Sequence, residues 1–229
     1  MARTDPLKPT ESAKGILIVD DHPLVRRGLT ALIESEPGLA VVAEASSCCG
    51  ALEAIDRTRP DLVIVDLALG TEDGLDLIKK LRLRNIETPV LVLSMYDESL
   101  YAERCLKAGA TGYITKRRLN EALLEALRSL LRGETYLSDK LQRRLVSKYV
   151  AGHKIDSETG PGALSDRQLQ VFRLLGEGLG TRDIAERLGL SIKTIESHRE
   201  HIKNKLNTRG SGELVRQAVQ WVESSRRLD

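Results

Sequence analysis

The sequence has few aromatic residues, few cysteines and no long hydrophobic run. Only 3% of its 229 residues are aromatic, so a stacking surface for single-stranded nucleic acid is not expected. The three cysteines (Cys48, Cys49 and Cys105) form no disulfide framework and lack metal-ligand spacing with histidine, which indicates reduced thiols. No stretch approaches membrane-spanning length, and the N-terminus carries no apolar signal segment. We therefore expect a soluble, cytoplasmic protein with no membrane partner.

Charge is unevenly distributed along the chain. Residues 1–136 contain 18 Lys and Arg against 21 Asp and Glu, a net charge of −3, whereas residues 137–229 contain 17 against 12, a net charge of +5. A chain of 229 residues, 41% of them hydrophobic, is long enough for two domains with cores of their own. The basic second part is a candidate for binding nucleic acid.

The first part alternates short apolar runs with helical periodicity. The unbroken run Leu62–Val65 is typical of a strand buried on both faces of a parallel sheet. Similar runs predict four further strands, and a helical pattern follows each of the five. The strands are expected at 16–19, 40–43, 62–66, 89–94 and 112–116. Five such alternations predict a doubly wound α/β domain with a five-stranded parallel sheet.

Polar residues stand at the carboxyl ends of four of these strands, where α/β proteins usually place their chemistry. They are Asp20-Asp21, Asp66, Ser94 and Lys116. Three clustered carboxylates repel one another unless a cation lies among them, and Mg²⁺ prefers such oxygen ligands. A hydroxyl and an ammonium group beside the metal would complete a pocket for a phosphate-like anion. Each residue alone is better explained as an ordinary surface group, but the convergence of all five favours one site.

Residues 15–132 resemble the receiver domain of bacterial two-component response regulators, which has a flavodoxin-like fold. The matching motifs are Asp20-Asp21, Asp66 with Asp73-Gly74, Ser94, and Gly109–Tyr113 leading to Lys116. The resemblance implies that Asp66 is the phosphoacceptor, that Ser94 and Lys116 contact phosphoryl oxygens, and that Tyr113 is an aromatic switch. It also implies a Mg²⁺ site formed by Asp20, Asp21, Asp66 and the main-chain carbonyl of Ala68. Two departures are Gly70, where the family usually has proline, and Arg117-Arg118 after the lysine.

Residues 1–14 are expected to form a flexible tail, and residues 133–163 a linker with a short helix. That helix is indicated by Leu141, Leu145, Val146 and Val150, and the composition of the polar segment 152–162 indicates a flexible tether.

Residues 164–229 show helical patterns throughout. A capping box at Ser165–Gln168 opens one helix. Two short helices joined at Gly189-Leu190, the second of them capped by Ser191, predict a helix-turn-helix. Helical hairpins in plain bundles share this pattern, so the pattern alone leaves both interpretations open. The segment resembles the four-helix DNA-binding domain of the LuxR type, on the motifs 184–188, Ser191, 194–198 and 202–206. Departures are Gln168 and Gln170 for the family's frequent Glu, and Gly180 for its capping Ser or Thr.

The predicted recognition helix has one apolar face, formed by Ile195, Ile202 and Leu206. Residues expected to enter the major groove of promoter DNA are Lys193, Glu196, Ser197, Glu200 and Asn204, and residues expected to contact phosphates are Arg182, Thr194, Lys203 and Lys205. A carboxylate near DNA either accepts from a cytosine amino group or is only part of a solvated helix face. For Glu196 and Glu200 the sequence leaves both alternatives open.

The two resemblances together imply a response regulator of the NarL/FixJ type. Such a protein accepts a phosphoryl group from a sensor histidine kinase, dimerises, binds promoter DNA and regulates transcription, with RNA polymerase as a further candidate partner. It is not expected to be an enzyme beyond its own phosphorylation and slow dephosphorylation. One alternative is a DNA-binding regulator whose receiver does not switch, which the intact acidic set disfavours. Another is an aspartyl-nucleophile phosphatase, which typically has a second Asp where Ala68 stands.

Overall fold

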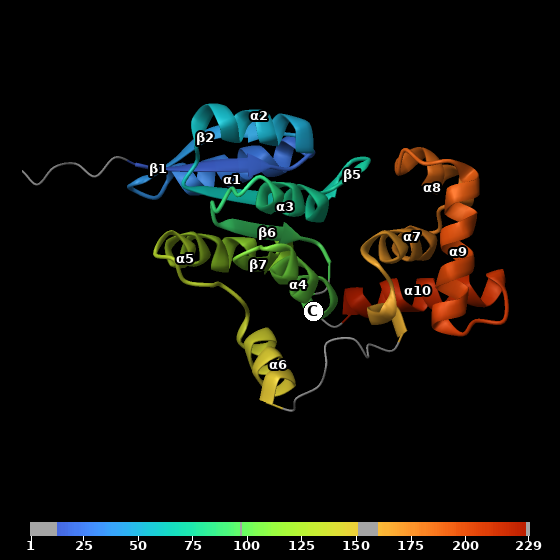
Figure 1. Cartoon of the computed structure of the whole chain (residues 1–229). Helices are drawn as coiled ribbons and strands as arrows, with labels where there is room; N and C mark the ends of the chain where they lie inside the picture. The colour runs from blue at the N-terminus through green and yellow to red at the C-terminus, as the bar shows by residue number, and fades with distance from the viewer. Residues whose placement is uncertain (1–12, 97, 151–159, 228–229) are drawn as a thin grey trace, which may run out of the picture. The chain divides into compact units, whose positions relative to one another are not determined.

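The computed structural model describes residues 13–96, 98–150 and 160–227 (Figure 1). It divides into two compact units. The first contains the described residues up to Leu69 together with Asp73–Ser94 and Ala108–Tyr136; the second contains Gly70–Glu72, Met95–Lys107 and the described residues from Leu137 onward. In the part of the chain that the structure describes, none of the helices is both long and apolar enough to cross a membrane.

The first unit is built on a five-stranded parallel sheet, as predicted. Its strands are β1 (Lys14–Val19), β2 (Leu39–Ala45), β3 (Leu62–Asp66), β6 (Val90–Ser94) and β7 (Gly112–Thr115). The strand order is β2-β1-β3-β6-β7, and every neighbouring pair is parallel. β1 and β3 therefore lie side by side at the centre, and their carboxyl ends bring Asp20, Asp21 and Asp66 to the same edge.

Both faces of the sheet are buried under helices, which is why the inner strands β3 and β6 are buried throughout and apolar up to their last residue. On one face, Ile16, Ile18 and Ile64 pack with α1 (Pro23–Glu34) and α5 (Leu119–Leu131) in a single core. Leu17, Val63 and Val92 alternate with these residues and are equally buried on the other face. Right-handed connections place α2 (Cys48–Thr58) and α3 (Gly74–Leu83) on that second face. Full burial of each such aliphatic side chain contributes roughly 1.5–3 kcal/mol.

Several helices of this unit begin at a proline or at a polar side chain that caps the first turn. Pro23 occupies the first turn of α1, and the Ser47 hydroxyl accepts a hydrogen bond from Gly50 N at the start of α2. Asp73 caps α3, because its Oδ1 accepts from Leu75 N at 2.9 Å. The helix predicted after the third strand is therefore present as α3, with Asp73 as its cap.

The connection from β3 to α3 contains an element that the sequence pattern did not predict. β4 (Ala68–Leu69) and β5 (Glu72–Asp73) form a small two-stranded ribbon. Gly70 turns the chain between them with a φ of +60°. Proline, which the family usually has at this position, cannot adopt a positive φ, so Gly70 matches the backbone conformation of this chain.

The bounds of four strands differ from the expected ones. β2 is longer than expected at both ends, and β6 begins at Val90 instead of residue 89. β1 begins at Lys14, which was expected in the tail, because Lys14 N donates to Gly38 O and its Nζ pairs with Asp61. Of the rest of the expected tail, residues 1–12 lie outside the described residues. β7 ends at Thr115, and Lys116 opens the short 3-10 helix η1 (Lys116–Arg118) instead of ending the strand.

The second unit contains α4 (Glu98–Ala108), α6 (Asp139–Val150) and the C-terminal helical domain. α6 is the helix predicted in the linker. The predicted tether lies mainly in residues 151–159, outside the described residues, and its last residues enter the 3-10 helix η2 (Gly160–Ala163).

The C-terminal domain contains the four predicted helices. They are α7 (Asp166–Gly176), α8 (Thr181–Arg187), α9 (Ile192–Leu206) and α10 (Ser211–Arg227). Their shared core includes Phe172, Ile184, Ile195, Ile202 and Leu214, which are almost completely buried. α7 and α10 pack so closely that a Cβ on Gly176 would lie 2.4 Å from Ala218 O. Only glycine allows this approach.

The predicted caps of this domain are present. Ser165 and Gln168 form the full capping box of α7. Ser191 caps α9, because its hydroxyl accepts from Thr194 N at 3.0 Å. Gly180 has no capping side chain, but Asp183 reaches back and accepts from Gly180 N at 3.1 Å. Asp183 therefore supplies half of a capping box where the family's serine or threonine is missing.

Candidate functional site

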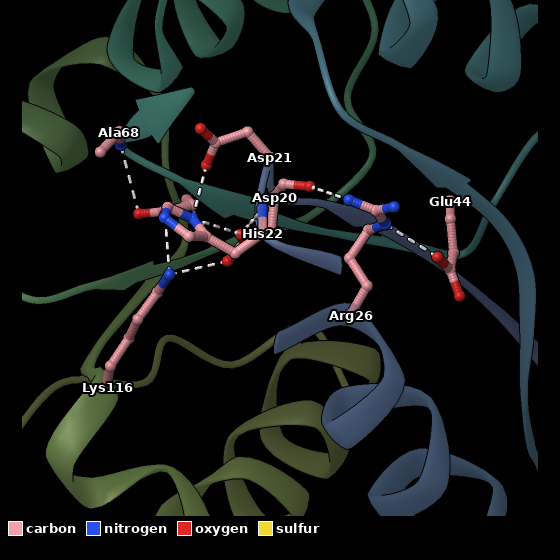
Figure 2. A network of polar contacts seen from close by, with 8 residues as sticks. Asp20, Asp21, His22, Arg26, Glu44, Ala68 and Lys116 are labelled. Carbon is pink, nitrogen blue, oxygen red and sulfur yellow. Dashed lines mark hydrogen bonds and ion pairs between the residues drawn. The ribbon is translucent and has the colours of Figure 1, made fainter. Parts of the chain in front are cut away.

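The carboxyl ends of β1, β3 and β7 meet in one acidic pocket (Figure 2). Asp20 and Asp66 are almost completely buried there, and Lys116 approaches from the start of η1. The Lys116 Nζ donates to Asp20 Oδ2 at 2.7 Å and to Asp66 Oδ2 at 2.6 Å. The structure therefore brings together two of the predicted carboxylates and the predicted lysine.

Asp21 and His22 complete the pocket. Oxygen atoms of Asp20, Asp21 and Asp66 and a ring nitrogen of His22 all lie within 4.8 Å of one another. His22 Nδ1 is 2.6 Å from Asp21 Oδ1, although this oxygen is buried and has no partner with hydrogen-bond geometry among the described residues. His22 was not predicted as a site residue. Its position immediately after Asp20-Asp21 was the available signal.

The electrostatics of the pocket reflect an excess of carboxylates over cations. Burial raises the pKa of Asp66 above its usual range; the ammonium of Lys116 acts in the opposite direction, and Asp20 adds to the rise. Burial alone would lower the pKa of Lys116, but Asp66 and Asp20 outweigh it, so the pKa of Lys116 is raised. One ammonium thus faces three carboxylates, and a further cation would relieve their repulsion.

The donor set fits a magnesium ion. Carboxylate oxygens at one sheet edge and an under-satisfied buried oxygen on Asp21 are the kind of ligands that Mg²⁺ takes, with waters in the remaining positions. Asp20, Asp21 and Asp66 would hold it. The main chain of Ala68 lies beside this set, because Ala68 N donates to Asp66 Oδ1 at 3.2 Å. Coordination by the Ala68 carbonyl stays a prediction.

Ser94 lies on β6, the strand next to that of Asp66, and Tyr113 lies on β7, one strand further along the sheet. Ser94 is the last residue of β6, is fully buried, and pairs in register with Thr115 of β7. Tyr113 of β7 is also buried. The predicted roles of Ser94 as a phosphoryl ligand and of Tyr113 as a switch stay predictions.

A second candidate site is the exposed face of α9. Lys193, Ser197, Glu200 and Asn204 recur every three or four residues and are exposed, opposite the buried Ile195 and Ile202. Glu196 and Lys205 on the same helix and Arg182 on α8 are also exposed. This is the arrangement expected of a recognition helix, and the predicted DNA contacts of individual residues stay predictions.

Four of the predicted DNA-contacting side chains have partners among the described residues of this unit. Glu200 pairs with Lys203 at 2.6 Å, one helical turn away. The Lys205 Nζ donates to Ala163 O at 3.0 Å, and the Thr194 hydroxyl lies 2.8 Å from that of Ser191. Arg199 was not predicted; it donates to the Thr181 hydroxyl and so joins α9 to the start of α8.

A doubly wound sheet with an acidic pocket and a paired lysine, followed by a helix-turn-helix domain, defines a receiver joined to a DNA-binding domain. Comparison with known families agrees. Residues 16–128 match the response regulator receiver domain, and residues 162–218 match the luxR family of bacterial regulatory proteins.

Known proteins match over most of the chain. The oxygen regulatory protein NreC of Staphylococcus epidermidis is 37% identical over 209 residues, which are 89% of this chain and 96% of NreC. The chain belongs to the response regulators of the NarL/FixJ type, with a receiver and a LuxR-type DNA-binding domain that serve transcription regulation.

Solved structures support this assignment. RcsB from Salmonella enterica serovar Typhimurium, bound to the promoter rprA in the presence of the phosphomimetic BeF₃⁻, is 25% identical with a TM-score of 0.64, over 91% of this chain and 99% of that one. A two-component response regulator of the LuxR family from Aurantimonas sp. SI85-9A1 is 34% identical with a TM-score of 0.56, over 61% of this chain and 99% of that one.

Proposed function

We propose that this protein is switched by phosphorylation of Asp66 and then regulates transcription as a dimer on promoter DNA. The observation that supports the proposal best is the convergence of Lys116, Asp20 and Asp66 within hydrogen-bonding distance. A cytoplasmic sensor histidine kinase is the proposed donor. The three cysteines form no disulfide, which fits the reducing cytoplasm that such a pathway occupies.

In the proposed reaction, an Asp66 carboxylate oxygen attacks the phosphorus of a phosphohistidine. The new P–O bond forms as the P–N bond breaks, and the leaving imidazole takes up a proton. Lys116 is placed to pair with a phosphoryl oxygen, and Ser94 to donate to another. Mg²⁺, when bound by Asp20, Asp21 and Asp66, supplies positive charge that offsets the charge of the transferred group. The protein's only chemistry is then its own phosphorylation and dephosphorylation.

The proposed output is carried by the exposed face of α9. The major groove accepts a helix of this kind, and the basic C-terminal part of the chain is attracted to phosphates. A phosphoryl group adds about −1.5 to −2 charges to the receiver, which is enough to reorder nearby loops and favour dimerisation. RNA polymerase is a candidate partner of the DNA-bound dimer.

Mass spectrometry and DNA binding test the proposal together. Wild type and Asp66→Asn are incubated with Mg²⁺ and acetyl phosphate, weighed as intact proteins, and then used for footprinting on genomic DNA of the source organism. We expect one added phosphoryl group and tighter DNA binding for wild type only. An equal mass increase in Asp66→Asn would show that the acceptor lies elsewhere. DNA binding by wild type that is indifferent to phosphorylation would favour the regulator with a non-switching receiver.

The phosphatase alternative has less support. Its second aspartate is replaced by Ala68, whose main chain instead bonds Asp66. Release of inorganic phosphate from many small phosphate esters, abolished in Asp66→Asn, would revive it.

A further inference from the structure

Arg26 lies in the first turn of α1, beside Asp20 (Figure 2). Its guanidinium donates from Nη1 to the main-chain oxygen of Asp20 at 2.7 Å and from Nε to Glu44 Oε2 at 2.8 Å (Figure 2). The Arg26 side chain is 18% exposed and that of Glu44 is 40% exposed, so the bond to the Asp20 carbonyl is better protected from water than the bond to Glu44. The receiver chemistry proposed above does not use Arg26.

Glu44 on β2 holds the guanidinium in place. Its second oxygen, Oε1, accepts from the Thr30 hydroxyl at 3.1 Å, so both carboxylate oxygens of Glu44 are bonded to α1. The next residue on the strand, Ala45, accepts through its main-chain oxygen from Asp20 N at 3.1 Å. Two consecutive residues of β2 therefore anchor the main chain of Asp20, one directly and one through Arg26.

Anchoring the Asp20 carbonyl also determines where Asp21 lies. The peptide bond between the two residues is planar and trans, so the direction of the Asp20 carbonyl sets the positions of the nitrogen and Cα of Asp21. Asp21 has no strand pairing of its own to hold it, because β1 ends at Val19. Its carboxylate nevertheless has to stay beside Asp20 and Asp66 despite their mutual repulsion.

We propose that Arg26 is a positioning residue for the cation site, which orients the Asp20–Asp21 peptide so that both carboxylates face a bound Mg²⁺. The inference rests on the proposed Mg²⁺-dependent phosphorylation of Asp66 for its functional meaning. The geometry itself does not depend on that proposal. Glu44 is the partner that makes Arg26 effective, because a guanidinium bonded to both groups has little freedom to move away from the carbonyl.

Arg27 provides a matched control. It is the next residue on the same helix, has the same charge and helix propensity, and is exposed. Comparison of Arg26→Met with Arg27→Met therefore separates loss of the specific hydrogen bonds from loss of one positive charge on α1. Glu44→Gln tests the contribution of the Arg26–Glu44 ion pair. Arg26→Lys keeps the positive charge but cannot donate in two fixed directions.

The experiment measures Mg²⁺ affinity by isothermal titration calorimetry on the full chain, with MgCl₂ as the only ligand. Thermal unfolding in EDTA is recorded for every variant. We expect Arg26→Met to weaken Mg²⁺ binding about tenfold, the lower end of what loss of a supporting group costs a metal site. Arg27→Met should stay within about twofold of wild type, as for an ordinary surface substitution. Glu44→Gln and Arg26→Lys should fall between them.

Phosphorylation by acetyl phosphate provides the second readout. Arg26→Met should be slow at limiting Mg²⁺ and should approach the wild-type rate at saturating Mg²⁺, because Asp66 and Lys116 are intact. A purely structural role would lower the unfolding midpoint without this dependence on Mg²⁺. If Arg26→Met does not fold, Glu44→Gln and Arg26→Lys carry the same comparison.

Equal Mg²⁺ affinities of Arg26→Met and Arg27→Met would overturn the inference, and so would a wild type that binds no Mg²⁺. The two proposals fail separately. Weakened Mg²⁺ binding in Arg26→Met with no phosphorylation of wild-type Asp66 would leave the positioning role intact and refute the proposed function. Normal phosphorylation of wild-type Asp66 with unaltered Mg²⁺ affinity in Arg26→Met would refute the positioning role and leave the proposed function intact.

Discussion

The Nζ of Lys116 lies 2.6 Å from Asp66 Oδ2, although the two residues are separated by 50 positions in the chain. Lys116 follows the last residue of β7, and Asp66 is the last residue of β3. These two strands are not neighbours, since β6 runs between them. The Lys116 side chain therefore passes the end of β6 and links the end of β7 to the end of β3. The bond is both the centre of the proposed site and a contact that holds the sheet edge together.

Replacement of Lys116 by Met should destabilise the receiver in Mg²⁺-free buffer. It leaves the buried carboxylates of Asp20 and Asp66 without their cation, which costs about 3 kcal/mol when one partner of a buried pair is removed. Hydrogen exchange of peptides covering β3, followed by mass spectrometry, measures the effect within this unit. Lys14→Met is the control: its ion pair with Asp61 is exposed, so about 0–1 kcal/mol is expected. Equal protection in the two variants would contradict the prediction.

Gly74→Ala should damage the site through the main chain. A Cβ on Gly74 would lie 2.1 Å from the main-chain oxygen of Asp66, so β3 and the start of α3 have to move apart. We expect a loss of about 1–3 kcal/mol, as for other overpacked positions, together with weaker Mg²⁺ binding.

Gly28→Ala is the matched control for Gly74→Ala. Its Cβ would meet nothing within 4 Å, and its position inside α1 favours alanine by about 0.8–1 kcal/mol. The two substitutions add the same methyl group and are expected to change the free energy of unfolding in opposite directions. Chemical denaturation followed by NMR signals of receiver residues measures both. A neutral or stabilising Gly74→Ala would contradict the close approach of α3 to the main chain of Asp66.

His198 on α9 should titrate below the ordinary histidine range, whose centre is about 6.5. Burial lowers its pKa first, and the positive charges of Arg167 and His201 add to the effect. Because the folded pKa is depressed, the unfolded chain binds the proton more readily. The contribution of neutral His198 to the stability of this domain is therefore fully present above the ordinary histidine pKa. It is lost as the pH falls through the lowered pKa of the folded state.

A proton–carbon NMR titration of the His198 ring checks the direction of this pKa shift. Arg167→Met should raise the pKa of His198, because it removes a nearby cation, whereas Lys193→Met, on the exposed face of the same helix, should leave it unchanged. A His198 pKa at or above the ordinary value in wild type would contradict the prediction.

Substitutions on α9 should separate affinity from sequence preference. Lys205→Ala should weaken binding to all DNA sequences and reduce the slope of its salt dependence by about one, as for a phosphate contact. Glu200→Ala should relax preference at one base pair per half-site by about 1–3 kcal/mol if Glu200 accepts from a cytosine amino group. The 2.6 Å ion pair of Glu200 with Lys203 provides the competing explanation, a carboxylate that only neutralises its neighbour.

Selection of bound sites from a random library decides between these roles of Glu200. An unchanged motif with uniformly tighter binding in Glu200→Ala would assign it to the solvated face. In that case Lys193, Glu196, Ser197 and Asn204 would remain as the exposed candidates for base contacts on this helix.

Local sequence patterns were sufficient for most secondary structure and for the class of fold. The run Leu62–Val65 predicted a doubly buried strand, and Ser165, Gln168 and Ser191 predicted caps that are present. These features depend on hydrophobic periodicity and on hydrogen bonds between residues a few positions apart, so they can be predicted from the sequence alone. The gathering of Asp20, Asp21 and Asp66 was also predictable, because parallel strands end at one edge of the sheet.

Tertiary structure decided the contacts between side chains that are distant in the chain. Periodicity contains no information about which carboxylate Lys116 reaches, nor that Arg26 bridges Asp20 and Glu44 across two strands. The β4–β5 ribbon has only two residues per strand, too few for an alternating pattern. Such features depend on strand order and on which side chains share a buried space, and both are settled only when the whole domain packs.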